Sequence, residues 1–396
     1  MNNEMKTKII NILAESLDIP DSAYEEATNR YRDLGEWLHD RSKAKSAQYN
    51  PHVFPQGSFR LGTAIKPWKR EDYDLDLSCN LKSGITKEKY TQEQLKQLIG
   101  EDLNAYREER GIRDKIEEKH RCWRLNYQDR LNFHMDIVPS IPQAEDVILI
   151  LKDQMIKAGS DEFYAHNVSE LALAVTDDRH RQYRVLSVDW EISNPEGYAG
   201  WFELRMRQAR ELLKSRAMVE HVAKVEDLPT YKWKTPLQRC VQILKRHRDV
   251  MFEGNPDGKP ISIIITTLAA RAYRGETDLY EAIDNILARI GDIVSPKEPR
   301  VPNPVDPRED FADKWGTREG SNIALERNFW LWLTQAKSDF NIITSSQDKN
   351  LIAEQAMQKY GARLEGNALS GIAGPSGVIT APKSYQIAGA GKPWHR

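Results

Sequence analysis

Hydrophobic and polar residues alternate in two different ways in the first half of the chain. Apolar residues recur at helical intervals up to Leu38 and predict a long amphipathic helix. Asp21-Ser22 could cap the start of this helix. Pro51 and Pro55 are expected to end it. A charged helical run follows at 87–110, and strand-like alternation occurs around 72–78, 122–127, 133–138 and 172–175. This mixture of strands and helices is typical of an α/β or α+β fold.

The second half has helical spacing almost throughout. Helices are predicted at 236–251, 261–273, 278–290, 322–340 and 347–360, with short turn signals between them. Beyond Leu364 the sequence is rich in Gly, Ala, Ser and Pro and ends AGAGKPWHR, which is typical of a flexible tail. We therefore expect three regions: a mixed core with an N-terminal spine helix at 1–225, a helical domain at 226–364 and a tail at 365–396.

Charge and cysteine content narrow the class of protein. The chain has 57 Lys+Arg against 59 Asp+Glu, a net charge of -2, which argues against binding DNA mainly through a large basic surface. The three cysteines are scattered and show neither zinc-site nor disulfide spacing. No apolar run approaches the roughly 20 residues that span a bilayer, and the N-terminus has no secretory pattern. The composition predicts a cytoplasmic protein without a membrane segment.

The segment DYDLDLS carries the first chemical signal. In a strand, Asp72, Asp74, Asp76 and Ser78 point to one face, and the intervening Tyr and Leu residues point to the other. Neighbouring carboxylates repel one another unless a cation compensates them. Mg²⁺ suits such a site because it prefers oxygen ligands and leaves positions open for substrate phosphates. The alternative is a solvated acidic edge strand, and this segment alone does not decide between the two.

The segment FPQGSFRLGT lies shortly before that strand. A glycine such as Gly57 allows backbone amides to approach a phosphate closely, and the hydroxyl of Ser58 can add a donor. A Gly-Ser pair by itself is usually an ordinary turn. Its position just before an Asp-x-Asp strand makes phosphate binding the better explanation, and the preceding Gln56 could reach a phosphate as well.

A third carboxylate occurs in FHMDIVPSIP. Asp136 stands at the centre of an otherwise apolar strand, where an unpaired carboxylate is costly. Taken alone, it could be half of a structural salt bridge. Taken with the Asp-x-Asp strand, a metal-site role explains it better.

These motifs together resemble those of a known enzyme superfamily. Gly-Ser, then Asp-x-Asp, then a third Asp on a later strand is similar to the polymerase-β nucleotidyltransferases. The strings FPQGSFRLGT, KREDYDLDL, CWRLNY and FHMDIVPSIP resemble the bacterial cGAS/DncV-like nucleotidyltransferases (CD-NTases), and SNPEGYAGWF, LQRCVQILKRHRD and PISIIITTLAARAY extend the resemblance into the second half. The resemblance implies an α+β fold: a polymerase-β-like core with a mixed sheet, packed against a helical lobe like that of oligoadenylate synthases and poly(A) polymerases.

The resemblance also implies an activity and a set of site residues. Asp74, Asp76 and Asp136 would hold two Mg²⁺ ions, for which Mn²⁺ may substitute. Gln56, Gly57 and Ser58 in the core, and Lys245 and Ser262 in the helical lobe, would contact the nucleotide triphosphate. Arg124, Tyr127 and Tyr198 are candidates for base recognition, because Arg and aromatic side chains stack on bases.

The implied function is synthesis of a cyclic di- or trinucleotide second messenger from ATP, GTP or other NTPs, in bacterial anti-phage (CBASS) signalling. Expected partners are a cognate effector that reads the product and an operon-encoded regulator or an enzyme that conjugates the C-terminus. Activation by DNA is not expected, because no Cys/His insertion is present and the net charge is slightly negative. Two alternatives stay open: a transferase that makes linear oligonucleotides or extends RNA 3′ ends, and a non-enzymatic binding protein.

Overall fold

The chain forms two compact units. The computed structural model describes residues 1–69, 72–128, 132–219, 233–364 and Leu369. Residues 19–202 make one unit, here called the mixed unit, and residues 1–18 together with the chain from 203 onward make the helical unit. The first 18 residues thus group with the helical unit, although the sequence suggested one core from residue 1. The expected boundary at 225/226 and all of the tail except Leu369 lie outside the described residues.

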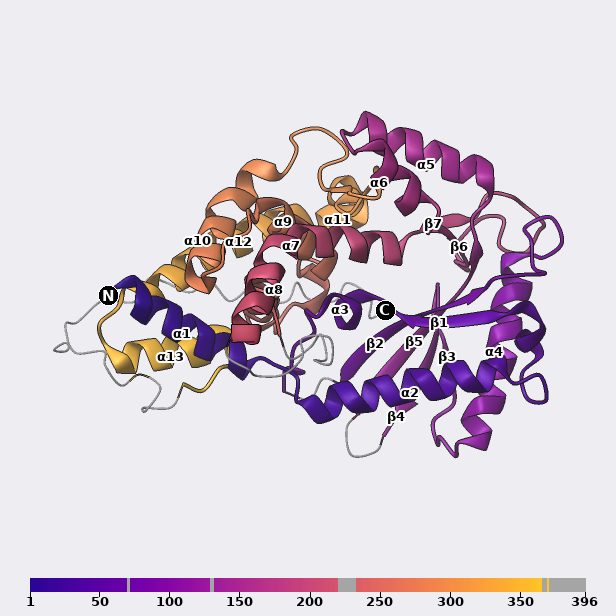
Figure 1. Ribbon diagram of the computed structural model, residues 1–396, viewed down its shortest axis with the longest axis horizontal. Coiled ribbons are helices and arrows are strands. Elements are labelled where there is room, and N and C mark those ends of the chain that lie inside the picture. The colour runs from indigo at the N-terminus through magenta and orange to yellow at the C-terminus, as the bar shows by residue number, and fades with distance from the viewer. Residues whose placement is uncertain (70–71, 129–131, 220–232, 365–368, 370–396) are drawn as a thin grey trace. The chain divides into compact units, whose positions relative to one another are not determined.

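The mixed unit contains both helices and strands (Figure 1). Its helices are α2 (Asp21–His39), α3 (Gly57–Leu61), α4 (Gln92–Glu109), α5 (Glu145–Lys157) and α6 (Glu162–Ser169). Its strands are β1 (Pro51–Pro55), β2 (Tyr73–Leu81), β3 (Glu117–Glu118), β4 (Trp123–Tyr127), β5 (Phe133–Pro142), β6 (Leu173–Val175) and β7 (Glu191–Ser193). Helix α7 (Pro195–Val219) begins in this unit and continues into the helical unit.

The strands form one mixed sheet in the order β1-β2-β5-β4-β3, with β6 and β7 continuing from β5. Strands β2 and β5 are parallel, with Asp74 opposite His134 and Asp76 opposite Asp136. Strand β4 runs antiparallel to β5 and places Arg124 opposite Asp136. Because side chains alternate along a strand, this register puts the acidic residues of β2 and β5 on one face.

The opposite face of the sheet is the core of the mixed unit. It presents a row of fully buried apolar residues: Leu75, Leu77, Leu125, Phe133, Met135 and Ile137. Helices α2 and α4 contact this face: the Arg30 guanidinium of α2 lies 4.8 Å from the centre of the Phe133 ring, and Trp123 donates from Nε1 to the Lys96 carbonyl of α4 at 2.8 Å. Burying one face fixes the strand register, since a shift by one residue would turn the acidic row into the core.

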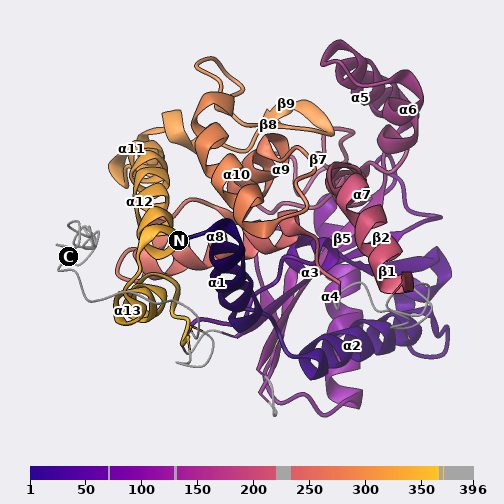
Figure 2. The ribbon, with the colours of Figure 1, turned by 60° about the vertical axis from the view of Figure 1, so that its left-hand side comes forward.

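The helical unit is built from α1 (Asn3–Ser16), α8 (Pro236–Met251), α9 (Ser262–Ala272), α10 (Leu279–Ile293), α11 (Arg318–Asn322), α12 (Leu325–Ser345) and α13 (Lys349–Tyr360). Helix α1 packs beside α8 and α10, far from it in sequence (Figure 2). Lys6 Nζ donates to the Tyr280 hydroxyl at 2.9 Å, and Thr7 Oγ1 donates to an Asp278 carboxylate at 2.6 Å. The short strands β8 (Pro302–Asn303) and β9 (Asp306–Asp310) pair with each other.

Several elements agree with the sequence-based expectations, and two details were wrong. The α+β class and all five helices predicted in the second half are confirmed. Helix α2, however, is preceded by Pro20 as N-cap, with no side-chain cap from Asp21 or Ser22, and it ends at His39. Pro51 and Pro55 do not end it; they are the first and last residues of β1, an edge strand that the sequence did not predict. Prolines are tolerated there because an edge strand needs only half of its hydrogen bonds.

Within the described ranges, no helix is long and apolar enough to cross a membrane.

Candidate active site

Three carboxylates converge on one face of the mixed sheet. Asp74 and Asp76 come from β2 and Asp136 from β5, and one oxygen of each lies within 4.8 Å of the others. The Asp74 side chain is 59% exposed, whereas that of Asp136 is only 15% exposed. The parallel register of β2 and β5 produces this arrangement directly, since it sets Asp76 beside Asp136. The prediction that the three carboxylates share one site is therefore met in geometry.

The chemistry of this donor set fits a hard divalent cation. All three groups offer oxygen, and three carboxylates so close together repel one another without positive charge nearby. An exposed acidic residue at one end and a nearly buried one at the other leave one side of the cluster open to solvent and substrate. We conclude that Asp74, Asp76 and Asp136 could hold a divalent metal.

The turn before β2 presses directly against that strand. Gly57 has a φ of +60°, and a Cβ built on it would come within 2.3 Å of Asp76 Oδ2. The backbone N–H of Gln56 donates to the Asp76 carbonyl at 2.8 Å. Only glycine adopts this conformation readily and leaves room for the carboxylate. Gly57 and Ser58, the first two residues of the short helix α3, are thus held next to Asp76.

Arg124 contacts the cluster directly. Its Nε donates to Asp136 Oδ1 at 2.6 Å and its Nη2 donates to Asp136 Oδ2 at 2.7 Å, so the guanidinium grips both oxygens. The same Nη2 lies 3.9 Å from Asp74 Oδ1. The hydrogen bonds with Asp136 raise the pKa of Arg124 above its usual range, despite partial burial. The salt bridge weighed as an alternative for Asp136 therefore exists, and it coexists with the carboxylate cluster.

The contact between Arg124 and Asp136 was missed in the sequence, where Arg124 was considered only for base recognition. A signal was present: an antiparallel pairing of CWRLNY with FHMDIVPSIP places Arg124 and Asp136 on the same face of adjacent strands. The pairing partner of each strand was not predicted, so this signal could not be used.

Cys122 lies close to the cluster without offering a nucleophile. Burial, and to a lesser degree the nearby Asp136 carboxylate, raises the pKa of its thiol to about 12. A thiol with that pKa stays protonated at neutral pH and reacts poorly. The site therefore has no activated cysteine at this position, in keeping with chemistry that needs no covalent protein intermediate.

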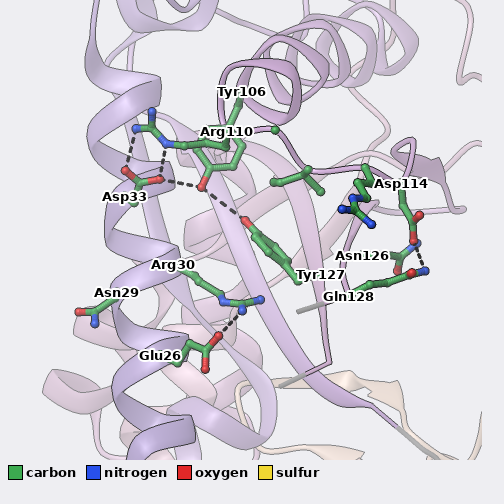
Figure 3. Close-up of a pocket in the computed structure, with 13 residues that line it drawn as sticks. Glu26, Asn29, Arg30, Asp33, Tyr106, Arg110, Asp114, Asn126, Tyr127 and Gln128 are labelled. Atoms are coloured by element: carbon green, nitrogen blue, oxygen red, sulfur yellow. Dashed lines mark hydrogen bonds and ion pairs between the residues drawn. The ribbon is translucent and has the colours of Figure 1, made fainter. Parts of the chain in front are cut away.

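Tyr127 lies on the core face of its strand, away from the carboxylates. It lines a pocket of about 600 Å³ between α2, the end of α4 and the end of β4 (Figure 3). Its hydroxyl is 3.4 Å from that of Tyr106, and the Arg30 guanidinium lies 4.1 Å from its ring centre. This position does not favour the predicted base contact at the carboxylate cluster.

The charged groups around this pocket are largely paired with one another. Asp33 accepts two hydrogen bonds from Arg110, both at 2.8 Å, and one from the Tyr106 hydroxyl at 2.8 Å (Figure 3). Arg30 forms an ion pair with Glu26 one turn earlier on the same helix. The contacts of Asp33 tie α2 to the end of α4, which indicates a structural role for Asp33 and Arg110.

The remaining candidates are placed as follows. Tyr198 is 7% exposed, and its ring centre is 5.4 Å from that of Trp201, which leaves little of it available to a base. In the helical unit, Lys245 is 7% exposed on α8. Ser262 is the first residue of α9, and its hydroxyl accepts a hydrogen bond from Arg248 Nη1 at 2.9 Å.

The fold and the site together resemble those of one class of protein. A polymerase-β-type nucleotidyltransferase is expected to have a mixed sheet in which two carboxylates of an Asp-x-Asp strand lie beside a third on a neighbouring parallel strand. A Gly-Ser turn is expected to lie against them. The mixed sheet of this chain has that arrangement. Comparison with solved structures supports this fold. CdnG of Bradyrhizobium diazoefficiens, solved with GTP, superposes with a TM-score of 0.62 at 19% identity, covering 89% of this chain and 94% of that one. CdnC of E. coli MS115-1, solved with ATP, gives 0.56 at 11% identity, covering 92% and 99%.

Sequence comparison shows which proteins the chain is similar to. Residues 51–139 match the nucleotidyltransferase domain described as cyclic GMP-AMP synthase DncV-like. A c-di-GMP synthase of Roseivirga ehrenbergii is 29% identical over 307 residues, which cover 76% of this chain and 71% of that protein. The cyclic dinucleotide synthase CdnG of B. diazoefficiens is 23% identical over 329 residues, covering 76% and 68%. The chain is accordingly similar to the DncV-like (CD-NTase) nucleotidyltransferases, the resemblance that its motifs predict.

Proposed function

We propose that this protein makes a cyclic di- or trinucleotide from NTPs. The observation that supports this most is the convergence of Asp74, Asp76 and Asp136 within 4.8 Å, in a chain whose relatives are named as cyclic dinucleotide synthases. Two structural neighbours are complexes with GTP and with ATP, which fits NTPs as substrates.

The proposed reaction forms one phosphodiester bond per step. A ribose hydroxyl oxygen attacks the α-phosphorus of an NTP, the bond between that phosphorus and the bridging oxygen breaks, and pyrophosphate leaves. The hydroxyl proton is lost to solvent. A second or third transfer of the same kind closes the ring. In that last step a ribose hydroxyl of the linear intermediate attacks the α-phosphorus of the intermediate's own 5′ triphosphate, and pyrophosphate leaves.

The three carboxylates would hold divalent ions, two Mg²⁺ in the mechanism we propose, with Mn²⁺ as a substitute. Such ions supply charge compensation for the phosphates and lower the pKa of the attacking hydroxyl. The contribution of the chain is positioning, which accounts for much of the rate in phosphoryl transfer. The β2–β5 register keeps Asp76 and Asp136 side by side, and the glycine at 57 leaves the Asp76 carboxylate unobstructed.

The triphosphate contacts are proposed from the family resemblance. In the mixed unit, Gln56, Gly57 and Ser58 follow β1 and lie beside Asp76, where their polar groups could meet phosphate oxygens. In the helical unit, Lys245 and Ser262 are the proposed contacts. Ser262 is positioned by Arg248, which also donates to the Pro260 carbonyl at 3.0 Å.

The biological role proposed is anti-phage (CBASS) signalling. In this role the cyclic product would activate a cognate effector, and an operon-encoded regulator or a conjugating enzyme would control the synthase. The support is the resemblance to CD-NTases, whose members include a CdnC solved as a complex with HORMA-deltaN.

The direct test is product analysis. The purified protein is incubated with all four NTPs and Mg²⁺ or Mn²⁺, the products are treated with phosphatase, and the remainder is identified by mass spectrometry. Asp74→Asn is the inactive variant. Asp153→Asn on α5 is its matched control. The Asp153 side chain is 55% exposed, against 59% for Asp74, and it forms an ion pair with Lys157, away from the carboxylate cluster.

The proposal predicts a phosphatase-resistant cyclic product from the wild type and from Asp153→Asn, and none from Asp74→Asn. Products from which phosphatase removes terminal phosphates would instead indicate a synthase of linear chains. Equal products from wild type and Asp74→Asn would contradict the proposed site.

A further inference from the structure

Arg124 occupies the side of the carboxylate cluster at which a cation is needed. It stands directly opposite Asp136 in the β4–β5 pairing, and it donates to both oxygens of that carboxylate, at 2.6 and 2.7 Å. Its Nη2 also lies 3.9 Å from the nearest oxygen of Asp74. One guanidinium therefore faces two of the three carboxylates that form the proposed metal site.

This geometry conflicts with simultaneous metal binding by all three carboxylates. A two-point guanidinium–carboxylate pair is among the strongest and most directional side-chain contacts, and it takes one acceptor position on each Asp136 oxygen. A divalent ion bound to the same carboxylate would also lie within a few ångströms of the guanidinium, where like charges repel. Arg124 is only 26% exposed, so solvent screens this repulsion incompletely.

We propose that Arg124 is a counter-ion latch that competes with the metal for Asp136. While no metal is bound, its guanidinium compensates the charge of Asp136 and holds that carboxylate in place. A divalent ion gains full use of the Asp136 carboxylate when the guanidinium moves off it. The latch thus weakens metal binding by the free protein, and Arg124 is a positioning residue, since it acts on the metal site through Asp136.

This inference rests on the proposed use of the three carboxylates as metal ligands, but it does not depend on the product. Its consequence is that the free protein holds metal weakly. A triphosphate that arrives together with the ion supplies additional oxygen ligands and negative charge. The ion in such a complex is therefore better able to displace the guanidinium.

Direct Mn²⁺ titration of the full-length protein tests the latch. Free Mn²⁺ is measured by electron paramagnetic resonance without nucleotide, for the wild type, Arg124→Met and Arg124→Lys. Methionine keeps much of the side-chain length without charge, and lysine keeps the charge but loses the two-point contact. We expect Arg124→Met to bind Mn²⁺ about tenfold more tightly than the wild type, with Arg124→Lys in between.

Two further variants make the result specific. Arg121→Met is the matched control, because Arg121 lies three residues away and its Nε pairs at 2.7 Å with Asp177, outside the cluster. It should bind Mn²⁺ like the wild type. The double variant Asp136→Asn, Arg124→Met should not show the tighter Mn²⁺ binding of Arg124→Met. That result would locate the bound Mn²⁺ at the carboxylate cluster.

Unchanged or weaker Mn²⁺ binding by both Arg124 variants would overturn the latch. This outcome is separable from that of the proposed function. If the protein makes no cyclic product but Arg124→Met binds Mn²⁺ more tightly than the wild type, the synthase proposal is contradicted and the latch is supported. A working synthase whose Arg124 variants bind Mn²⁺ like the wild type contradicts the latch alone.

Discussion

Gly57 and Asp76 show how closely individual residues are fitted at the site. The glycine adopts a left-handed backbone conformation, and the Asp76 carboxylate occupies the space where a Cβ atom at position 57 would lie. The sequence predicted both residues, because a Gly-Ser turn before an Asp-x-Asp strand is a specific pattern. It did not predict the salt bridge of Asp136 with Arg124, because that contact depends on which strands pair.

The fit at Gly57 predicts a specific defect for Gly57→Ala. A Cβ at this position would approach Asp76 Oδ2 to 2.3 Å and displace a metal-site carboxylate. A displacement of about 1 Å at a reacting centre can cost roughly 100-fold in rate, and we expect a loss of product formation of about this size. The measurement is the initial rate of product formation by the folded variant.

Gly111→Ala separates the clash from backbone strain. Gly111 has nearly the same φ, +65°, but a Cβ there meets no atom within 4 Å. Both variants should lose about 1 kcal/mol of stability from the left-handed conformation, and only Gly57→Ala should lose activity. Equal loss of activity in the two variants would show that the contact with Asp76 is unimportant.

At the scale of elements, strand pairing positions the chemistry and helices stabilise it. The alternation in DYDLDLS and FHMDIVPSIP predicted which residues share a face, and β2 and β5 confirm it. The order of strands in the sheet, and edge strand β1, could not be predicted, because pairing is decided by contacts distant in sequence. The helices of the second half were predicted well, because their 3.6-residue periodicity is a local property.

The link between α2 and the end of α4 predicts a pH-dependent contribution to stability. Hydrogen bonds from Arg110 hold the pKa of Asp33 below its usual value of 3.8, although partial burial opposes this. Since the pKa is lowered on folding, the pair stabilises the protein above about pH 4 and loses this contribution as the pH falls through the lowered value. The Asp33 side chain is 41% exposed, so the contribution should be at most about 1 kcal/mol.

Chemical denaturation of Asp33→Asn at several pH values checks this expectation. The variant should be less stable than the wild type near pH 7, and the difference should shrink below about pH 4. Arg110→Gln should show the same loss, and the double variant should lose little more, because both changes remove one interaction. A difference that is the same at every pH would mean that the ionised Asp33 is not its source.

At the scale of the whole molecule, the charge balance argues against binding DNA mainly through a large basic surface. The net charge is -2 over 396 residues. In the part of the chain that the structure describes, the only cluster with metal-ligand geometry is the acidic one on β2 and β5. Neither feature favours activation by duplex DNA, which needs an extended basic surface.

We therefore expect product formation to be independent of double-stranded DNA. Initial rates with and without duplexes of mixed sequence, at low and moderate salt, provide the measurement. Because binding to DNA phosphates weakens steeply with salt, activation that is strong at low salt and lost at moderate salt would contradict this expectation.

The central claim is that Asp74, Asp76 and Asp136 together bind the catalytic metal. The most direct measurement is a crystal structure of the full chain with Mn²⁺ and a non-hydrolysable NTP, with anomalous scattering used to locate manganese. The claim predicts anomalous peaks in direct coordination distance of all three carboxylates. An ordered nucleotide with no manganese among them would contradict it.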